Sequence, residues 1–240
     1  MKKIEIGDIV SRAWDLAVKH WPVFVLIAFL EECFSGIGVN YDSTAFSGLG
    51  QNPDPQLIIE TIRESLTVSP WLIVGLLVTL YLGFITYRML RNAIVNGKPY
   101  ETVGDALKID ITQFAIFFAV EVCYGLAVGI GSFFCLIPGL FLLVRWMFAP
   151  LIVATENVSF SEAFSRSWNL TKGHFWSLFL LGIVAVGIVI LGLCACCVGV
   201  FFAEVIINFM MMLAYLDLKG DDAPQVTAEA TETADFVEIQ

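Results

Sequence analysis

Five ionisable side chains lie within strongly apolar stretches of the sequence, and these residues are the best placed to do chemistry: Glu31, Glu32, Glu121, Arg145 and Glu204. On insertion scales a charged group at the centre of a bilayer costs about 2.5–3.5 kcal/mol, so each one needs a partner or a wet cavity. An arginine among carboxylates can bind a lipid headgroup, an ion or a proton. The same arginine can instead form a buried salt bridge that only fixes helix packing, and both hypotheses stay open.

Position along the chain predicts which of these charges share a depth. Arg145 follows Pro138, a predicted corner, by seven residues, which at about 1.5 Å per residue puts it roughly 10 Å below that corner. Glu204, Glu31 and Glu32 lie at a similar distance from the corners next to them. We therefore predict an intramembrane polar cluster in the outer leaflet, in which Arg145 pairs with Glu204, Glu32 or Glu31.

Glu121 is predicted to be an isolated intramembrane acid. It precedes Pro138 by 17 residues, roughly 25 Å of helix, so it lies toward the opposite side of the membrane from Arg145. We expect its carboxyl group to be protonated, or bonded to Tyr124 or to a hydroxyl group of a neighbouring helix.

The sequence contains no pattern typical of catalysis or of metal binding. No nucleophile is spaced with a base, and none of the six cysteines has CxxC spacing with histidines nearby. We therefore expect no enzyme activity, no cofactor and no metal. Cysteines near two predicted corners can form a disulfide or act as small apolar packing residues: Cys135, Cys194, Cys196 and Cys197.

The composition is that of a membrane protein. Hydrophobic residues make up 58% of the 240 positions and charged residues only 15%, and the mean hydropathy is +0.81. The net charge is −10, but much of the acid lies in the last 24 residues, so nucleic acid is not an expected partner. The expected partners are membrane lipids, with a membrane protein or a second copy of the chain also possible.

Apolar stretches predict six membrane-spanning helices. One crossing needs ~20 residues, so the run from 175 to 216 must turn back, and its corner is predicted near 192–199. The long polar segment 40–69 is predicted to be a loop with a short helix at 55–66. The other predicted spans are 21–39, 70–90, 114–135 and 140–155.

Glycines in these stretches permit helices to approach closely. Gly125 and Gly129 have GxxxG spacing, and Gly182, Gly187 and Gly192 recur in the fifth span. Such glycines pack helices within one chain or between two copies, and we favour packing within the chain.

Short amphipathic helices are predicted before three of the spans, at 4–19, 102–113 and 159–174. Residues 11–16 align without gaps on 165–170, at an offset of 154, and a weaker copy begins at residue 103. We interpret the unit as an interfacial helix followed by two spans, repeated near 4–95, 100–155 and 159–219, within a membrane domain of residues 1–220. The alternative is that all interfacial helices look alike. Residues 221–240 are predicted to be an acidic disordered tail.

The basic residues predict the orientation. Lysines and arginines cluster before the first span, between the second and third, between the fourth and fifth, and after the sixth, whereas Arg63 is alone on the other side. By the positive-inside rule both termini and the three amphipathic helices are cytoplasmic. Trp14 and Trp168, at matching positions of two of these helices, are predicted to be interfacial anchors.

One segment resembles a known family. Ile137-Pro138-Gly139, Arg145 and the pattern within 162–173 resemble the membrane domain of glycerophosphoryl diester phosphodiesterase-type proteins and related six-helix bacterial inner-membrane proteins. The specific match covers roughly a fifth of the chain. In that family a soluble catalytic barrel is often fused to the membrane domain, and this chain has none. The resemblance therefore implies a fold and an inner-membrane location, not the phosphodiesterase activity.

These observations predict an all-α, polytopic membrane protein with six spans in three hairpins. The favoured hypothesis is a non-catalytic plasma-membrane protein that organises lipid or a membrane partner. The alternative is a transporter or a protein that handles lipid headgroups through the cluster around Arg145, which predicts a continuous polar cavity there.

Overall fold

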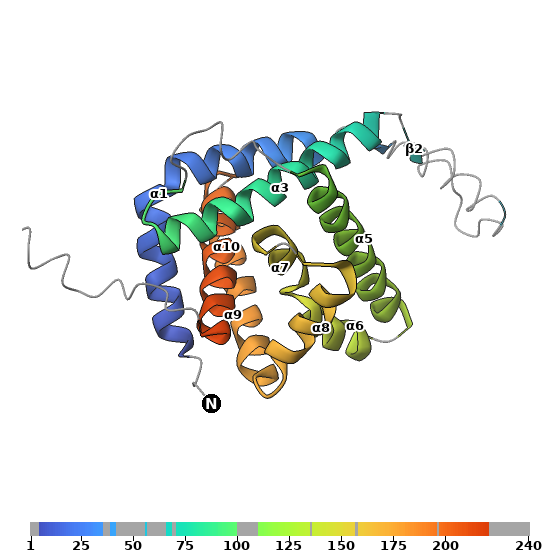
Figure 1. Cartoon of the computed structure of the whole chain (residues 1–240). Coiled ribbons are helices and arrows are strands. Elements are labelled where there is room, and N and C mark those ends of the chain that lie inside the picture. The colour runs from blue at the N-terminus through green and yellow to red at the C-terminus, as the bar shows by residue number, and fades with distance from the viewer. Residues whose placement is uncertain are drawn as a thin grey trace, which may run out of the picture. The chain divides into compact units, whose positions relative to one another are not determined.

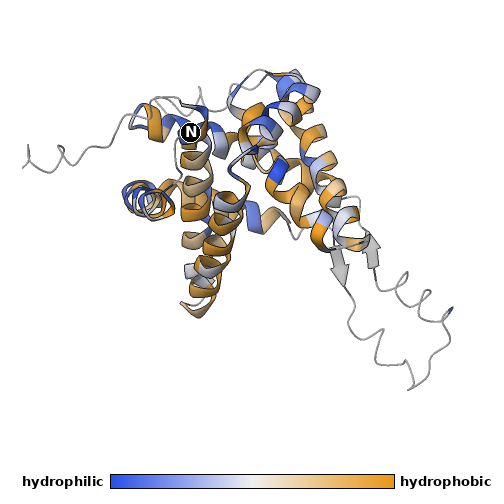
Figure 2. Ribbon diagram, turned by 90° about the horizontal axis from the view of Figure 1, so that it is seen from below, coloured by the Kyte–Doolittle hydropathy of each residue, from blue (hydrophilic) through white to orange (hydrophobic). Residues whose placement is uncertain are grey.

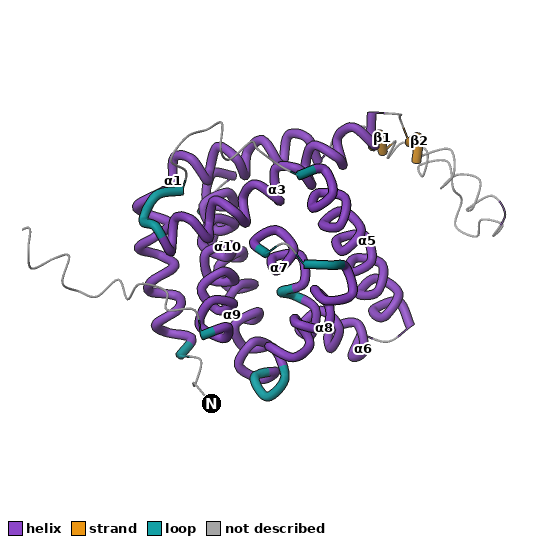
Figure 3. The backbone as a smooth tube through the Cα atoms, in the orientation of Figure 1, coloured by secondary structure: helices purple, strands orange, loops and turns teal. Residues whose placement is uncertain are grey.

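The chain is helical over nearly all of its described length (Figures 1 and 3). The computed structural model describes residues 5–35, 39–41, 56, 66–68, 71–99, 110–134, 136–156, 158–195 and 197–220. The helices are α1 (Ile6–Ser35), α3 (Trp71–Val95), α5 (Ile111–Phe134), α6 (Leu136–Trp146), α7 (Ala149–Thr155), α8 (Phe160–Thr171), α9 (Phe175–Cys194) and α10 (Cys197–Lys219).

Several predictions from the sequence lie outside the described residues. They concern most of the amphipathic helix at 102–113, the short helix at 55–66, Cys135, Cys196 and the acidic tail at 221–240. A three-residue antiparallel pairing of β1 (Val39–Tyr41) with β2 (Leu66–Val68) lies at the two ends of the segment 40–69 that was predicted to be a loop, and this pairing was not predicted.

The predicted fold class is confirmed. Six helices are long and apolar enough to cross a membrane, and in Figure 2 the helices are hydrophobic over most of their length. The fourth span is composite, since α6 and α7 together make it. The six segments are Ile6–Phe34, Ile73–Val95, Ile111–Phe133, Ile137–Thr155, Phe175–Cys194 and Gly199–Lys219.

The first span differs from its prediction. The amphipathic segment and the apolar segment form one continuous helix, α1, because no glycine or turn-forming pair separates Lys19 from Trp21. Pro22 therefore lies inside the helix instead of at its start. A proline there cannot donate to the carbonyl oxygen of Val18, so that hydrogen bond is lost while the helix continues.

The chain forms two compact units, residues 1–28 with 84–240 and residues 29–83. In the first unit α10 is the central helix. Its segment Phe209–Leu216 is almost entirely buried. The ring centroids of Phe24 in α1 and Phe209 are 5.1 Å apart. Those of Phe148, between α6 and α7, and Tyr215 are 5.9 Å apart. The C-terminal half of α10 is therefore fixed on several sides.

Two hairpins of this unit are held by glycines at their corners. A Cβ on Gly139 would overlap Ser132 and lie 2.5 Å from its backbone nitrogen, and one on Gly192 would lie 2.7 Å from the carbonyl oxygen of Gly199. By contrast, a Cβ on Gly125 or Gly129 would meet nothing within 4 Å. The prediction that Gly125 and Gly129 pack helices within the chain is thus wrong, because these glycines face outward from α5.

Candidate functional site

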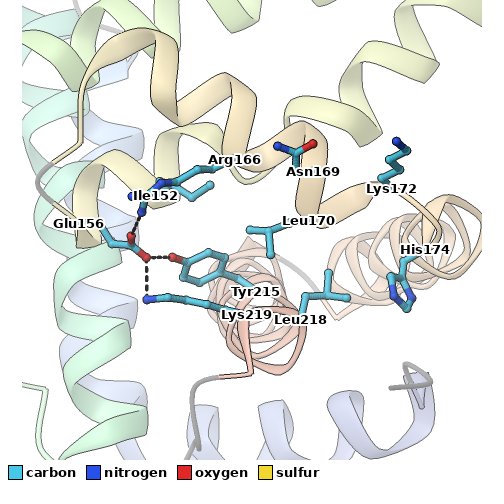
Figure 4. Close-up of a pocket in the computed structure, with 10 residues that line it drawn as sticks. All are labelled: Ile152, Glu156, Arg166, Asn169, Leu170, Lys172, His174, Tyr215, Leu218 and Lys219. Atoms are coloured by element: carbon cyan, nitrogen blue, oxygen red, sulfur yellow. Dashed lines mark hydrogen bonds and ion pairs between the residues drawn. The ribbon is translucent and has the colours of Figure 1, made fainter. Parts of the chain in front are cut away.

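A cavity of about 460 Å³ opens between the end of α7, one face of α8 and the end of α10 (Figure 4). Its lining combines charged, amide and apolar side chains. The lining residues are Ile152, Glu156, Arg166, Asn169, Leu170, Lys172, His174, Tyr215, Leu218 and Lys219. We call this cavity the α8–α10 pocket.

Glu156 is the centre of one end of the pocket. Its Oε2 accepts from Arg166 Nη1 at 2.5 Å, and its Oε1 accepts from Lys219 Nζ at 2.8 Å and from the Tyr215 hydroxyl. Partial burial tends to raise the pKa of Glu156, but the hydrogen bonds from Lys219 and Tyr215 and the charges of Lys219 and Arg166 outweigh it. The pKa of Glu156 is therefore below its ordinary value, and the carboxylate stays ionised near neutral pH.

The other end of the pocket carries hydrogen-bond donors without an acid. Asn169, Lys172 and His174 lie there, away from the dashed contacts of Figure 4. Lys172 is exposed and makes no ion pair within the described residues. Arg166 differs, because it also binds Glu162 at 2.5 Å, one helical turn earlier. The uncompensated positive charge of the pocket is thus that of Lys172.

The turn from α8 to α9 places these donors. Lys172 ends α8 with an extended backbone, and Gly173 follows with φ +91°, a conformation that favours glycine. The chain then reverses, and His174 precedes α9. Lys172 and His174 therefore flank a glycine turn at the mouth of the pocket, where the apolar helix begins.

Arg145 has different neighbours from those predicted. Its guanidinium stacks on the rings of Phe141, Trp168 and Phe175, at 5.0–5.8 Å from their centroids. Trp168 belongs to α8 and Phe175 opens α9, so Arg145 lies on the amphipathic-helix side. The prediction assumed a straight span from Pro138, whereas the fourth span breaks at residues 147–148.

The predicted ion pair between Arg145 and Glu204 does not form in the described structure. Nε and Nη1 of Arg145 are buried without a hydrogen-bond partner there, and the three rings replace the predicted carboxylate. Glu204 lies within α10. Glu31 and Glu32 belong to the unit 29–83, which is described by itself, so their pairing with Arg145 stays a prediction.

Glu121 is half-buried on α5, and its predicted bond to Tyr124 is not the contact that the tyrosine hydroxyl makes. That hydroxyl instead donates to the carbonyl oxygen of Leu143 at 3.3 Å.

The two predicted interfacial anchors differ in their surroundings. Trp14 is 53% exposed, and its ring centroid lies 5.5 Å from that of Phe202. Trp168 packs on the guanidinium of Arg145. Trp168 therefore packs within the protein, and its role as an interfacial anchor stays a prediction.

The break of the fourth span is supported by α8. Ser167 Oγ donates to the carbonyl oxygen of Arg145 at 2.9 Å, and Thr171 Oγ1 lies 3.4 Å from the same oxygen. Pro150, which has no N–H, follows the break. In membrane helices, hydroxyl groups of neighbours commonly satisfy carbonyls that a proline break leaves free.

We expect Ser167→Ala to lower the free energy of unfolding by about 1 kcal/mol, since it removes the donor of a part-buried hydrogen bond to the carbonyl oxygen of Arg145. Ser165→Ala, an exposed change on the same helix, serves as the control and should alter stability by less than about 0.5 kcal/mol. Thermal unfolding of the purified protein in detergent measures both. Equal effects of the two changes on stability would contradict the proposal that Ser167 stabilises the break of the fourth span.

Two arginines at matching positions make matching contacts. Arg12 binds Asp8 at 3.0 Å and Asp217, and Arg166 binds Glu162 and Glu156. In each case the first acid lies one turn earlier and the second lies at the end of a membrane-spanning helix. These contacts fit the predicted repeat of residues 11–16 and 165–170, which itself stays a prediction.

Sequence reasoning missed Glu156, Tyr215 and Lys219 as site residues. Tyr215 and Lys219 are 59 or more residues from Glu156 along the chain, and only Arg166 is nearer to it in sequence. The only available signal was an acid after the fourth span and a base after the sixth, both on the predicted cytoplasmic side.

Comparison with known proteins identifies a family. A family described as a domain of unknown function, DUF7847, matches residues 103–233, more than half of the chain. The chain belongs to this family. The match covers α5 to α10 and so includes every residue that lines the α8–α10 pocket. No curated protein and no solved structure matches the chain. The family assignment therefore indicates neither a reaction nor a ligand.

Proposed function

We propose that the protein is a non-catalytic plasma-membrane protein that organises lipid, and that it does so by binding lipid headgroups in the α8–α10 pocket. The six helices that are long and apolar enough to span a membrane support the proposal that the protein lies in a lipid bilayer. The distribution of basic residues supports an orientation with both termini and the pocket on the cytoplasmic side.

The observation that carries this proposal is the chemistry of the open end of the pocket. Lys172 has no acidic partner among the described residues, and Asn169 adds an amide donor. Leu170 and Leu218 line the same cavity. A phospholipid presents a phosphate joined to an apolar body, so it matches a lining that is cationic on one side and apolar on the other. The pocket also lies where α9 begins and α10 ends, and the ends of two predicted spans support a position near the boundary of the bilayer.

The two matching amphipathic segments, at 4–19 and 159–174, share an ion-paired arginine but differ in the residues that could bind a phosphate. Arg12 keeps the double ion pair of Arg166. However, the positions that correspond to Asn169 and Lys172 hold Asp15 and Val18. The arginine framework and a histidine, His20 or His174, are thus common to both segments, whereas Asn169 and Lys172 have counterparts that cannot bind phosphate in the same way.

Transport stays the alternative, and one observation favours it. The fourth span is discontinuous beside Arg145, and broken helices line the substrate path in many transporters. The pocket, however, is lined by the opposite face of α8 and does not include Arg145. Headgroup binding therefore has the better structural support.

The proposal is tested by Lys172→Ala. The change removes an exposed, unpaired cation and should leave the fold intact, while retention of phospholipid by the detergent-purified protein should fall about fivefold, as for the loss of one basic contact to an anionic surface. Native mass spectrometry counts the retained lipids. Lys98→Ala, which removes an exposed lysine outside the pocket, is the matched control. Equal retention by both variants would overturn the proposal.

A further inference from the structure

We infer that the α8–α10 pocket selects anionic phospholipids over zwitterionic ones. This inference rests on the proposed function and adds the class of headgroup. It follows from two features of the lining, namely which acceptors are occupied and which sign of charge prevails.

The first feature is the engagement of Glu156. Among the described residues that line the pocket it is the only carboxylate, and both of its oxygens are engaged, one by Arg166 and the other by Tyr215 and Lys219. An ethanolamine or choline group carries a positive charge that needs an acidic neighbour when it enters a pocket. Because each oxygen of Glu156 already binds a cation, such a headgroup would have to compete with Arg166 or Lys219 for this carboxylate.

The second feature is the net charge of the lining. Three bases, Arg166, Lys172 and Lys219, face one carboxylate. The balance stays positive when Glu162, which binds Arg166 from outside the pocket, is counted. A positive lining attracts phosphate and repels ammonium groups. A phosphodiester with an uncharged substituent, as in phosphatidylglycerol, satisfies both features.

The test compares lipids that share acyl chains and differ in headgroup. Delipidated protein in neutral detergent is titrated with phosphatidylglycerol, phosphatidylethanolamine or phosphatidylcholine, and bound lipid is counted by native mass spectrometry. We expect phosphatidylglycerol to bind about fivefold more tightly than either zwitterionic lipid. Lys172→Ala should bring the three affinities close together, and Lys172→Glu should reverse the order. Lys98→Glu should keep the wild-type preference.

Other outcomes separate this inference from the proposed function. Equal binding of the three lipids, weakened to the same degree by Lys172→Ala, would overturn charge selection and leave headgroup binding in place. Insensitivity of every lipid to both Lys172 variants would overturn both proposals. Inorganic phosphate, added as a soluble competitor, should displace phosphatidylglycerol only weakly because it cannot contact Leu170 and Leu218. Tight binding of phosphate that lipid does not displace would assign the pocket to a soluble anion instead.

Discussion

Replacing Gly139 by alanine is expected to destabilise the α5–α6 hairpin by about 3 kcal/mol, the upper part of the usual range for overpacking. The added methyl group would overlap Ser132 and lie 2.5–2.7 Å from its backbone nitrogen and Cα. A side chain can rotate away, but a helix backbone cannot move without separating α5 from α6. The free energy of unfolding in detergent, followed by the loss of helical circular dichroism with denaturant, measures the effect.

Gly129→Ala is the matched control for this change. Gly129 lies in the same hairpin, and a Cβ there meets nothing within 4 Å. Both variants gain the same helix propensity, about 0.5–1 kcal/mol for glycine to alanine within a helix. A difference between them therefore reports the steric clash alone, and equal stabilities would mean that the hairpin is not packed as described.

Replacing Glu156 by glutamine is expected to cost about 1–2 kcal/mol, between the values for an exposed and a buried ion pair. The change leaves Arg166 and Lys219 without their shared carboxylate, and Glu156 itself is only 16% exposed. The cost stays below the range for buried pairs because Arg166 and Lys219 are 46% and 30% exposed and water screens part of their charge. Glu162→Gln removes the exposed partner of the same arginine and should cost only about 0.3–0.5 kcal/mol.

The same carboxylate predicts a pH dependence. Because folding lowers the pKa of Glu156, its contribution to stability is fully present above the ordinary value of 4.5 and is lost as the pH falls through the lower pKa of the folded state. Wild-type protein should therefore lose stability below about pH 5 more steeply than Glu156→Gln. Melting temperatures between pH 7 and pH 3.5 measure both slopes, and parallel slopes would exclude Glu156 as the source.

Hydropathy predicted the six spans because burial in lipid acts on each helix separately. It did not reveal the continuity of α1, which runs through Pro22 because no glycine or turn-forming pair ends the helix there. It also did not reveal the break between α6 and α7, although Pro150 was visible. A proline allows either a kink or a break, and Ser167 and Thr171 of a different helix support the break seen here.

The site was predicted less well because it depends on contacts between distant segments. The depth argument grouped Arg145 with Glu204 on the assumption of straight, parallel spans. The structure shows that aromatic rings can take the place of a carboxylate beside a buried guanidinium. Glu156 was not predicted because it lies just beyond the fourth span and looks like an ordinary loop acid in sequence.

The most direct test of headgroup binding is an experimental structure of the protein in nanodiscs that contain phosphatidylglycerol. Headgroup density should lie in the α8–α10 pocket, with its phosphate within hydrogen-bonding distance of Lys172 and with Glu156 still bound to Arg166 and Lys219. An empty or closed pocket, with ordered lipid only along the outer faces of the helices or beside Arg145, would contradict the proposal.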